Sequence, residues 1–101
     1  MNGVVQIRSF KKEDEAFIFA TWLRHLWYSK DNKTTLSKET FMRLHHSRIS
    51  DLLNSRPVEV ACLAEDPDVI VGYAVHDDNR FTYLKKAWRG LGVEKLFKET
   101  P

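Results

Sequence analysis

The sequence predicts an α+β fold, a largely antiparallel four-stranded sheet with helices packed on it, in the order β-α-α-β-β-β-α. Three observations support this class. Two stretches place apolar residues three and four positions apart, which is the spacing of a helix face. Four short runs are rich in β-branched and aromatic residues, and turn residues separate the last three runs. A chain of 101 residues is typical of one domain, so we expect residues 1–101 to form a single domain.

The chain opens with an expected strand followed by an expected helix. Residues 4–10 alternate well enough between apolar and polar side chains for a strand. Asp14 then supplies negative charge where a helix N-terminus favours it. In residues 16–28 the apolar positions form one helix face, which Phe17 and Trp22 widen, so we expect this helix to be deeply packed.

A polar stretch at residues 29–33 predicts a loop before a second helix. Ser37 is placed to cap the N-terminus of this helix, because a serine hydroxyl accepts hydrogen bonds from first-turn N–H groups. Apolar residues then recur at helical spacing between positions 41 and 53. Pro57 predicts the end of the helix, since the residue before a proline is pushed out of the α region.

The second half of the chain predicts a three-stranded meander. Residues 58–64 and 69–75 are β-rich, and the acidic, proline-containing stretch 65–68 between them predicts a hairpin turn. Residues 77–79 predict another turn, and residues 81–85 the third strand of the meander.

Two small residues within these strands carry specific expectations. Gly72 predicts a bulge or a close approach of neighbouring backbone. Cys62 lies in an apolar run and is expected to be a buried small hydrophobe. As the single cysteine it excludes an internal disulfide and is typical of a reducing compartment, so we expect a cytoplasmic protein. No apolar run approaches the roughly 18 residues that a membrane-spanning helix needs, and no signal peptide is evident.

The most informative segment is Arg89-Gly90-Leu91-Gly92, which follows the last expected strand and leads into an expected helix. A strand, a glycine-containing turn and a helix N-terminus can form an anion site, because backbone N–H groups and the helix dipole point at one spot. The residues alone equally allow an ordinary strand-turn-helix corner, with the glycines present for backbone geometry.

The charge distribution is strongly asymmetric around this segment. Residues 59–78 contain six acidic residues and no lysine or arginine, whereas residues 80–98 contain six basic residues and one acid, Glu94. This pattern is consistent with a solvated hairpin beside a basic helix, or with a positive end that attracts an anion. Nucleic acid is not expected as a partner, because no recognisable nucleic-acid motif accompanies the basic residues.

His45 and His46 are adjacent and invite a metal hypothesis. Neighbouring helix residues point about 100° apart, so the two rings cannot share one ion well. No Cys, Asp or Glu stands beside them at ligand spacing. We therefore expect a packed or surface histidine pair and no metal site.

With these motifs the chain resembles the N-terminal two-thirds of the GNAT acetyltransferase fold. Residues 7–14 (Ile-Arg-Ser-Phe-Lys-Lys-Glu-Asp) resemble the family's first strand and the start of its first helix. Residues 71–75 resemble its third strand, and residues 83–93 its fourth strand and acetyl-CoA loop. Within the family, the chain is most similar to GNAT-like proteins encoded by bacteriophages. The resemblance implies a C-terminally truncated GNAT-like domain, because the family's later strands have no counterpart here.

The resemblance implies acetyl-CoA as the cofactor, with the pyrophosphate held by backbone N–H groups of the loop. The cofactor-binding residues it implies are Tyr83, Leu84, Lys85, Arg89, Gly90, Leu91, Gly92 and Val93. Arg89, Gly92 and the spacing match the family's loop motif, but Glu94 stands where the family keeps a small residue. A carboxylate turned outward would favour a helix N-terminus, and one turned inward would oppose the ligand.

The family's reaction implies possible N-acetyl transfer, but the missing C-terminal elements disfavour catalysis. Glu59 and Glu65 are candidates for a general base, but we expect both to be surface carboxylates.

A final strand without a neighbour would leave an uncovered edge, with four aromatic residues on or near it: Phe81, Tyr83, Trp88 and Phe97. This edge, residues 81–85, suggests a homodimer. The alternative function is a non-catalytic phage protein that binds or inhibits a host protein through this edge and the basic C-terminal patch.

Overall fold

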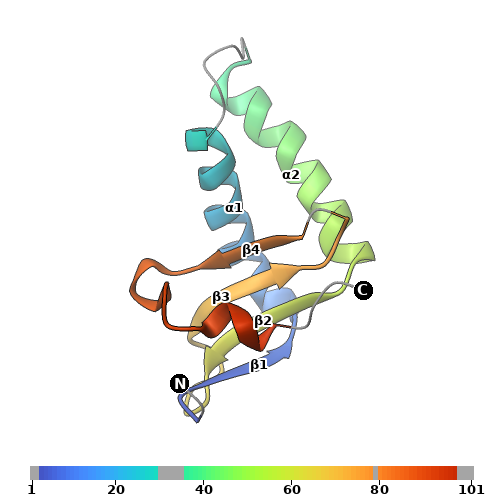
Figure 1. The fold of residues 1–101 in the computed structure, drawn as a ribbon. Helices are drawn as coiled ribbons and strands as arrows, with labels where there is room; N and C mark the ends of the chain where they lie inside the picture. The colour runs from blue at the N-terminus through green and yellow to red at the C-terminus, as the bar shows by residue number, and fades with distance from the viewer. Residues whose placement is uncertain (1–2, 30–35, 79, 98–101) are drawn as a thin grey trace. The chain divides into compact units, whose positions relative to one another are not determined.

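A computed structural model of the chain describes residues 3–29, 36–78 and 80–97. It confirms the predicted α+β class (Figure 1). The elements are β1 (Val5–Ser9), α1 (Glu15–Ser29), α2 (Lys38–Ser55), β2 (Val58–Leu63), β3 (Ile70–Val75) and β4 (Phe81–Leu84). The chain divides into two compact units, a helical unit of residues 11–55 and a sheet unit formed by residues 1–10 with 56–101. No helix of the described residues is long and apolar enough to cross a membrane.

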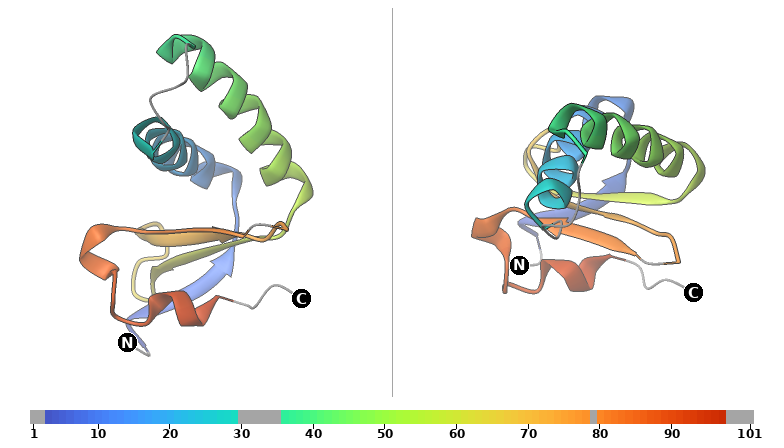
Figure 2. Two further views of the ribbon diagram at one scale, coloured as in Figure 1. Left: turned by 45° about the horizontal axis from the view of Figure 1, so that its top comes forward. Right: turned by 90° about the horizontal axis from the view of Figure 1, so that it is seen from above.

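The sheet unit is built on four strands in the order β1-β2-β3-β4, each antiparallel to its neighbour. Figures 1 and 2 show the strands lying side by side. The register aligns Ser9, Glu59, Ala74 and Thr82 in one row across the sheet. Since side chains alternate between faces along a strand, these four residues share a face. The predicted hairpin turn at residues 65–68 is confirmed, with the Asp68 N–H donating to Asp66 Oδ1 at 3.3 Å.

Gly72 has the close backbone approach that the sequence predicts. A Cβ at this position would overlap the carbonyl oxygen of Tyr83 and Cδ2 of Leu84 on β4. The pairing of β2 with β3 also shifts register between Ala61 and Cys62, opposite Gly72. The absence of a side chain at Gly72 therefore lets β4 lie close to β3 at the end that leads into the loop.

The segment after β4 packs against one face of the sheet (Figure 2). It contains two 3₁₀ turns, Lys86–Trp88 and Val93–Leu96. Val93 and Phe97 are buried in a core cluster with Val5, Ala61 and Ala74. The helix expected after the loop is thus a four-residue 3₁₀ turn within the described residues. The expectation that Phe97 lies uncovered is wrong, because it is only 4% exposed, while Phe81, Tyr83 and Trp88 are partly buried.

The helical unit consists of α1 and α2 with an N-terminal 3₁₀ turn. Ser37 caps α2 as predicted, because its Oγ accepts the N–H of Thr40 at 3.2 Å. Asp14 lies in the 3₁₀ turn before α1, where its buried carboxylate accepts the N–H of Lys11 at 2.7 Å. The two helices meet through aromatic contacts, such as the edge-to-face pair Trp27 and Phe41, whose ring centroids lie 5.2 Å apart. Of the predicted loop, residues 30–33 lie outside the described residues, as does Asn79 in the turn before β4.

The adjacent histidines of α2 are both packed against aromatic rings. His46 stacks on Phe19 with centroids 4.0 Å apart, and His45 lies 4.3 Å from the ring of Phe41. The described residues contain no group of three or more His, Cys, Asp or Glu side chains placed to hold a metal ion. Burial lowers the pKa of His45, and the nearby Arg48 guanidinium lowers it further.

We predict that Gly72→Ala destabilises the protein. The added methyl group would overlap the β4 backbone, so the strands must separate, and we expect a loss of about 1–3 kcal/mol in the free energy of unfolding. Urea denaturation followed by circular dichroism measures this. Gln6→Ala is the control, because Gln6 is an exposed residue of β1 in the same sheet, and surface substitutions usually change the free energy of unfolding little. An unchanged urea midpoint for Gly72→Ala would show that the approach of β4 is not tight.

We also predict that His45 makes the free energy of unfolding fall as the pH falls below about 6.5. Its folded pKa is lowered, so the unfolded chain takes up the proton first. The loss begins near the unfolded pKa and is complete below the folded one. His45→Gln should flatten this part of the pH–stability curve, and an NMR titration of the imidazole should give a pKa below 6.5. A titration midpoint at or above that value would contradict the account.

Candidate functional site

The loop between β4 and Val93 has an open backbone. The N–H of Trp88 donates to the carbonyl of Lys85 at 2.8 Å, and the N–H of Arg89 to that of Lys86 at 3.3 Å. Residues 89–92 form a turn, and within the described part of the chain none of the N–H groups of residues 90–93 has a short, well-aligned backbone acceptor. Consecutive N–H groups in a turn that lack internal acceptors can converge on an anion.

Both loop glycines adopt positive φ angles, 76° at Gly90 and 87° at Gly92. Other residues rarely adopt this conformation, so glycine is required here by the backbone rather than by packing. A Cβ at either position would meet no atom within 4 Å, which means that the space beside the loop backbone is open. A ligand could therefore approach the peptide groups closely.

Arg89 ties the loop to the end of β4. Its Nε donates to the carbonyl oxygen of Leu84 at 2.8 Å, and its guanidinium carbon lies 5.8 Å from the centre of the Tyr83 ring. Three of the residues that the sequence places in the site are thus brought together. The hydrogen bond uses Nε, so the two terminal nitrogens of the guanidinium can still face an anionic group.

The remaining predicted site residues surround this contact. Lys85 is partly buried, with its N–H donating to the carbonyl of Val71 at 2.8 Å. The Leu91 side chain is 48% exposed, whereas that of Val93 is fully buried, so Val93 can offer a ligand only its backbone. Glu94 is exposed, which agrees with the outward-turned of the two alternatives that the sequence left open.

The 3₁₀ turn at Val93–Leu96 changes the physical basis of the anion hypothesis. A turn of four residues carries little of the macrodipole that a long helix would place at its N-terminus. Positive potential must come mainly from the backbone N–H groups and the basic side chains of the segment. The exposed basic residues here are Lys86, Arg89 and Lys95.

Glu59 and His76 form a second polar site, and the sequence analysis did not identify them as a pair. Glu59 Oε1 and His76 Nε2 lie 2.6 Å apart, a distance at which a ring N–H donates to the carboxylate. Their side chains are 14% and 9% exposed, so the expectation of a surface carboxylate is wrong for Glu59, while Glu65 is exposed. The register could have revealed the pair: Glu59 aligns with Ala74, which makes His76 a diagonal neighbour on the same face.

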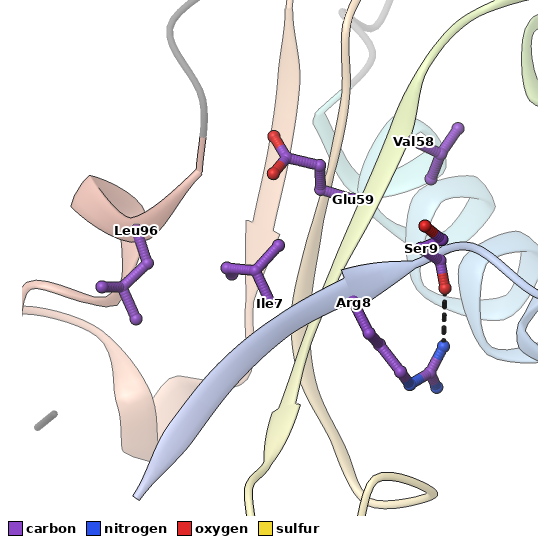
Figure 3. Close-up of a pocket in the computed structure, with 6 residues that line it drawn as sticks. All are labelled: Ile7, Arg8, Ser9, Val58, Glu59 and Leu96. Carbon is purple, nitrogen blue, oxygen red and sulfur yellow. Dashed lines mark hydrogen bonds between the residues drawn. The ribbon is translucent and has the colours of Figure 1, made fainter. Parts of the chain in front are cut away.

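Glu59 also borders a cavity of about 400 Å³ on the sheet unit. Figure 3 shows the side chains of Ile7, Glu59 and Leu96 converging on one space. The full lining is Ile7, Arg8, Ser9, Val58, Glu59 and Leu96. We call this space the Glu59 cavity.

Three solved structures share the fold of this chain. They are apo YjaB from Escherichia coli (20% identity, TM-score 0.60), a proposed acetyltransferase from Acinetobacter baylyi (17%, 0.57), and YncA from Salmonella typhimurium, a proposed acetyltransferase solved with its cofactor acetyl-CoA (22%, 0.52). The alignments cover 92%, 91% and 92% of this chain and 60%, 56% and 61% of those structures.

These likenesses establish a GNAT-like α+β fold, and the chain spans about three-fifths of the length of the structures it matches. No family model matches the sequence. No curated protein matches it significantly in sequence either.

We predict an energetic coupling between Glu59 and His76. In a double-mutant cycle of Glu59→Gln and His76→Asn, the partly buried pair should give a coupling of about 0.5–3 kcal/mol. Urea denaturation of the four proteins measures it. Arg56 and Asp77 form a more exposed pair at 3.1 Å and serve as the comparison, with an expected coupling below about 1 kcal/mol. Equal couplings for the two pairs would show that burial of the Glu59–His76 pair has no energetic consequence.

Proposed function

We propose that this chain is an acetyl-CoA-binding GNAT-like protein of the bacteriophage-encoded type, acting in the cytoplasm as one domain. The coenzyme pyrophosphate would bind the N–H groups of residues 90–93. The observation that carries the proposal is the loop backbone, with two glycines at positive φ and no short, well-aligned internal acceptor for these N–H groups among the described residues. Such a turn suits an anion with several oxygen acceptors.

The charges around the loop favour a polyanion over a neutral ligand. The segment of residues 86–97 carries three exposed basic side chains, those of Lys86, Arg89 and Lys95. Its single acid, Glu94, is also exposed to water. An exposed carboxylate is screened by solvent and counter-ions and opposes the ligand less than a buried one would. The pyrophosphate would therefore meet more positive than negative charge.

The outer edge of β4 supplies a way to orient the rest of the coenzyme. The N–H of Lys85 points to Val71 on β3, and alternation along an antiparallel strand turns the peptide groups of Leu84 outward. The carbonyl oxygen of Leu84 already accepts from Arg89, in agreement with this direction. The Leu84 N–H would then donate to a carbonyl of the pantetheine arm or its acetyl group.

N-Acetyl transfer is the reaction class that this proposal allows. It requires a deprotonated amine held near a polarised thioester carbonyl. Leu84 can supply the polarising N–H. Among the described residues, the geometry identifies no general base next to Leu84. Coenzyme binding is thus the first property to test.

We predict that isothermal titration calorimetry detects acetyl-CoA binding to the wild-type protein, and that Gly92→Glu abolishes it. The substitution forces a side chain onto a backbone at φ 87° and adds a negative charge beside the loop. Arg89→Ala should weaken binding by about tenfold or more, because it removes a charged donor and loosens the loop from Leu84.

Arg43→Ala is the control, because Arg43 is an exposed arginine on α2 whose loss changes the net charge equally. It should bind like the wild type. No heat from the wild type at millimolar acetyl-CoA would refute the proposal, and equal weakening by Arg43→Ala would reduce it to a net-charge effect.

A second candidate is a non-catalytic protein that docks a host protein on the outer edge of β4 and the basic patch. The observation that favours it is that β4 is the last strand of the sheet in the described residues, which leaves outward peptide groups for strand pairing. A homodimer through residues 81–85 would use the same groups. Light scattering at high concentration separates these cases, since only the homodimer doubles the mass without a partner.

A further inference from the structure

The outer edge of β4 carries peptide groups that no strand of the described residues pairs. The N–H of Lys85 donates to the carbonyl of Val71 on β3. Alternation along the strand therefore turns the peptide groups of Thr82 and Leu84 to the opposite side. The carbonyl of Leu84 already accepts from Nε of Arg89 at 2.8 Å. The N–H and carbonyl of Thr82 and the N–H of Leu84 remain in one row, which is the pattern that an added strand pairs with.

The side chains of β4 leave this edge partly exposed, because all four residues of the strand are only partly buried. Phe81 and Tyr83 share one face of the sheet, where their ring centroids lie 6.1 and 5.5 Å from that of Tyr73. Thr82 and Leu84 share the other face. An added strand would place its side chains beside aromatic rings on one face and beside Leu84 on the other, which favours β-branched residues in the partner.

The segment around this edge is strongly basic. The described residues 80–97 contain a single acid, Glu94, and five basic residues: Arg80, Lys85, Lys86, Arg89 and Lys95. Arg80 precedes β4, and Lys85 and Lys86 follow it, so positive charge stands at both ends of the strand. Complementary charges around an interface mainly determine which partner is selected. The edge is therefore suited to a partner with acidic residues.

A second copy of this chain fits the edge less well than an acidic segment does. Pairing of two β4 strands would bring together two segments in which basic residues outnumber acids. Like charges on neighbouring strands destabilise their pairing. The charges thus distinguish between the two occupants that an open edge allows, a homodimer and a different protein.

We propose that the outer edge of β4 binds an extended acidic segment of another protein as an added strand. The backbone of the partner pairs with the peptide groups of Thr82 and Leu84, and its carboxylates lie near the basic residues at the two ends of β4. This inference rests on the second proposed function, docking on the edge of β4, and names the chemical class of the partner.

The test is an NMR titration of the ¹⁵N-labelled full chain with two blocked six-residue peptides. Both alternate valine and threonine at the four central positions, and one has glutamate at each end where the other has lysine. We expect the glutamate peptide to cause saturable shifts of the Thr82 and Leu84 amides. The lysine peptide should bind at least about tenfold more weakly, because each end charge changes the affinity a few-fold at an exposed site. The titration contains no coenzyme, so its result does not depend on acetyl-CoA binding.

Two further comparisons separate strand pairing from charge attraction. A glutamate peptide that is N-methylated at its central peptide bonds keeps the charges but cannot pair as a strand, so it should not bind. Lys86→Glu should weaken binding of the glutamate peptide by about two- to fivefold and strengthen that of the lysine peptide. Lys12→Glu is the matched control, because it reverses the charge of an exposed lysine in the helical unit and should leave both affinities unchanged.

The possible failures of this inference and of docking on the edge are distinguishable. Equal affinities for the glutamate and lysine peptides, or an unaltered response of Lys86→Glu, would overturn the acidic class of the partner while edge docking stands. Undiminished binding of the N-methylated peptide, or no shift of the Thr82 and Leu84 amides with either peptide, would overturn edge docking itself. The spectrum of free Lys86→Glu reports whether that variant is folded.

Discussion

The packing of Val93 and Phe97 onto the sheet is the interaction on which the candidate sites depend. Val93 is 0% and Phe97 4% exposed in the core formed with β1, β2 and β3. This contact returns the chain to the sheet after β4, so the loop at residues 85–92 is fixed at both ends. Burying two such side chains contributes roughly 3–6 kcal/mol, enough to hold a loop whose own backbone makes few hydrogen bonds. The same packing positions Leu96 as a wall of the Glu59 cavity.

The two ends of the loop are held by different forces, and this explains its composition. At the Val93 end the anchor is apolar burial, which does not depend on direction. At the β4 end the anchor is directional, through Arg89 on the Leu84 carbonyl and the Tyr83 ring. The glycines between them let the backbone turn without strain and leave space beside it, because a Cβ at either position would meet no atom within 4 Å. A loop organised in this way is suited to bind through its backbone, with arginine serving both as anchor and as charge.

The sequence predicted the fold class and most of the elements because its local signals agree with one another. Ser37 capped α2 as expected, and Gly72 lies at the predicted close approach of two strands. The helix expected after Gly92 is a four-residue 3₁₀ turn within the described residues. Apolar spacing cannot distinguish such a turn from the start of a longer helix. The Glu59–His76 pair depends on register, which a single sequence does not specify to one residue. The coenzyme residues are brought together at Tyr83, Leu84 and Arg89, and their role stays a prediction.

The central claim is that the backbone of residues 90–93 binds the coenzyme pyrophosphate. Its most direct measurement is an amide NMR titration that compares acetyl-CoA with acetyl-pantetheine, which carries the same thioester and no pyrophosphate. The account predicts that acetyl-CoA shifts the amide resonances of Gly90, Leu91, Gly92 and Val93 and that acetyl-pantetheine leaves them in place. Equal shifts from both ligands, or acetyl-CoA shifts confined to residues outside the loop, would contradict it.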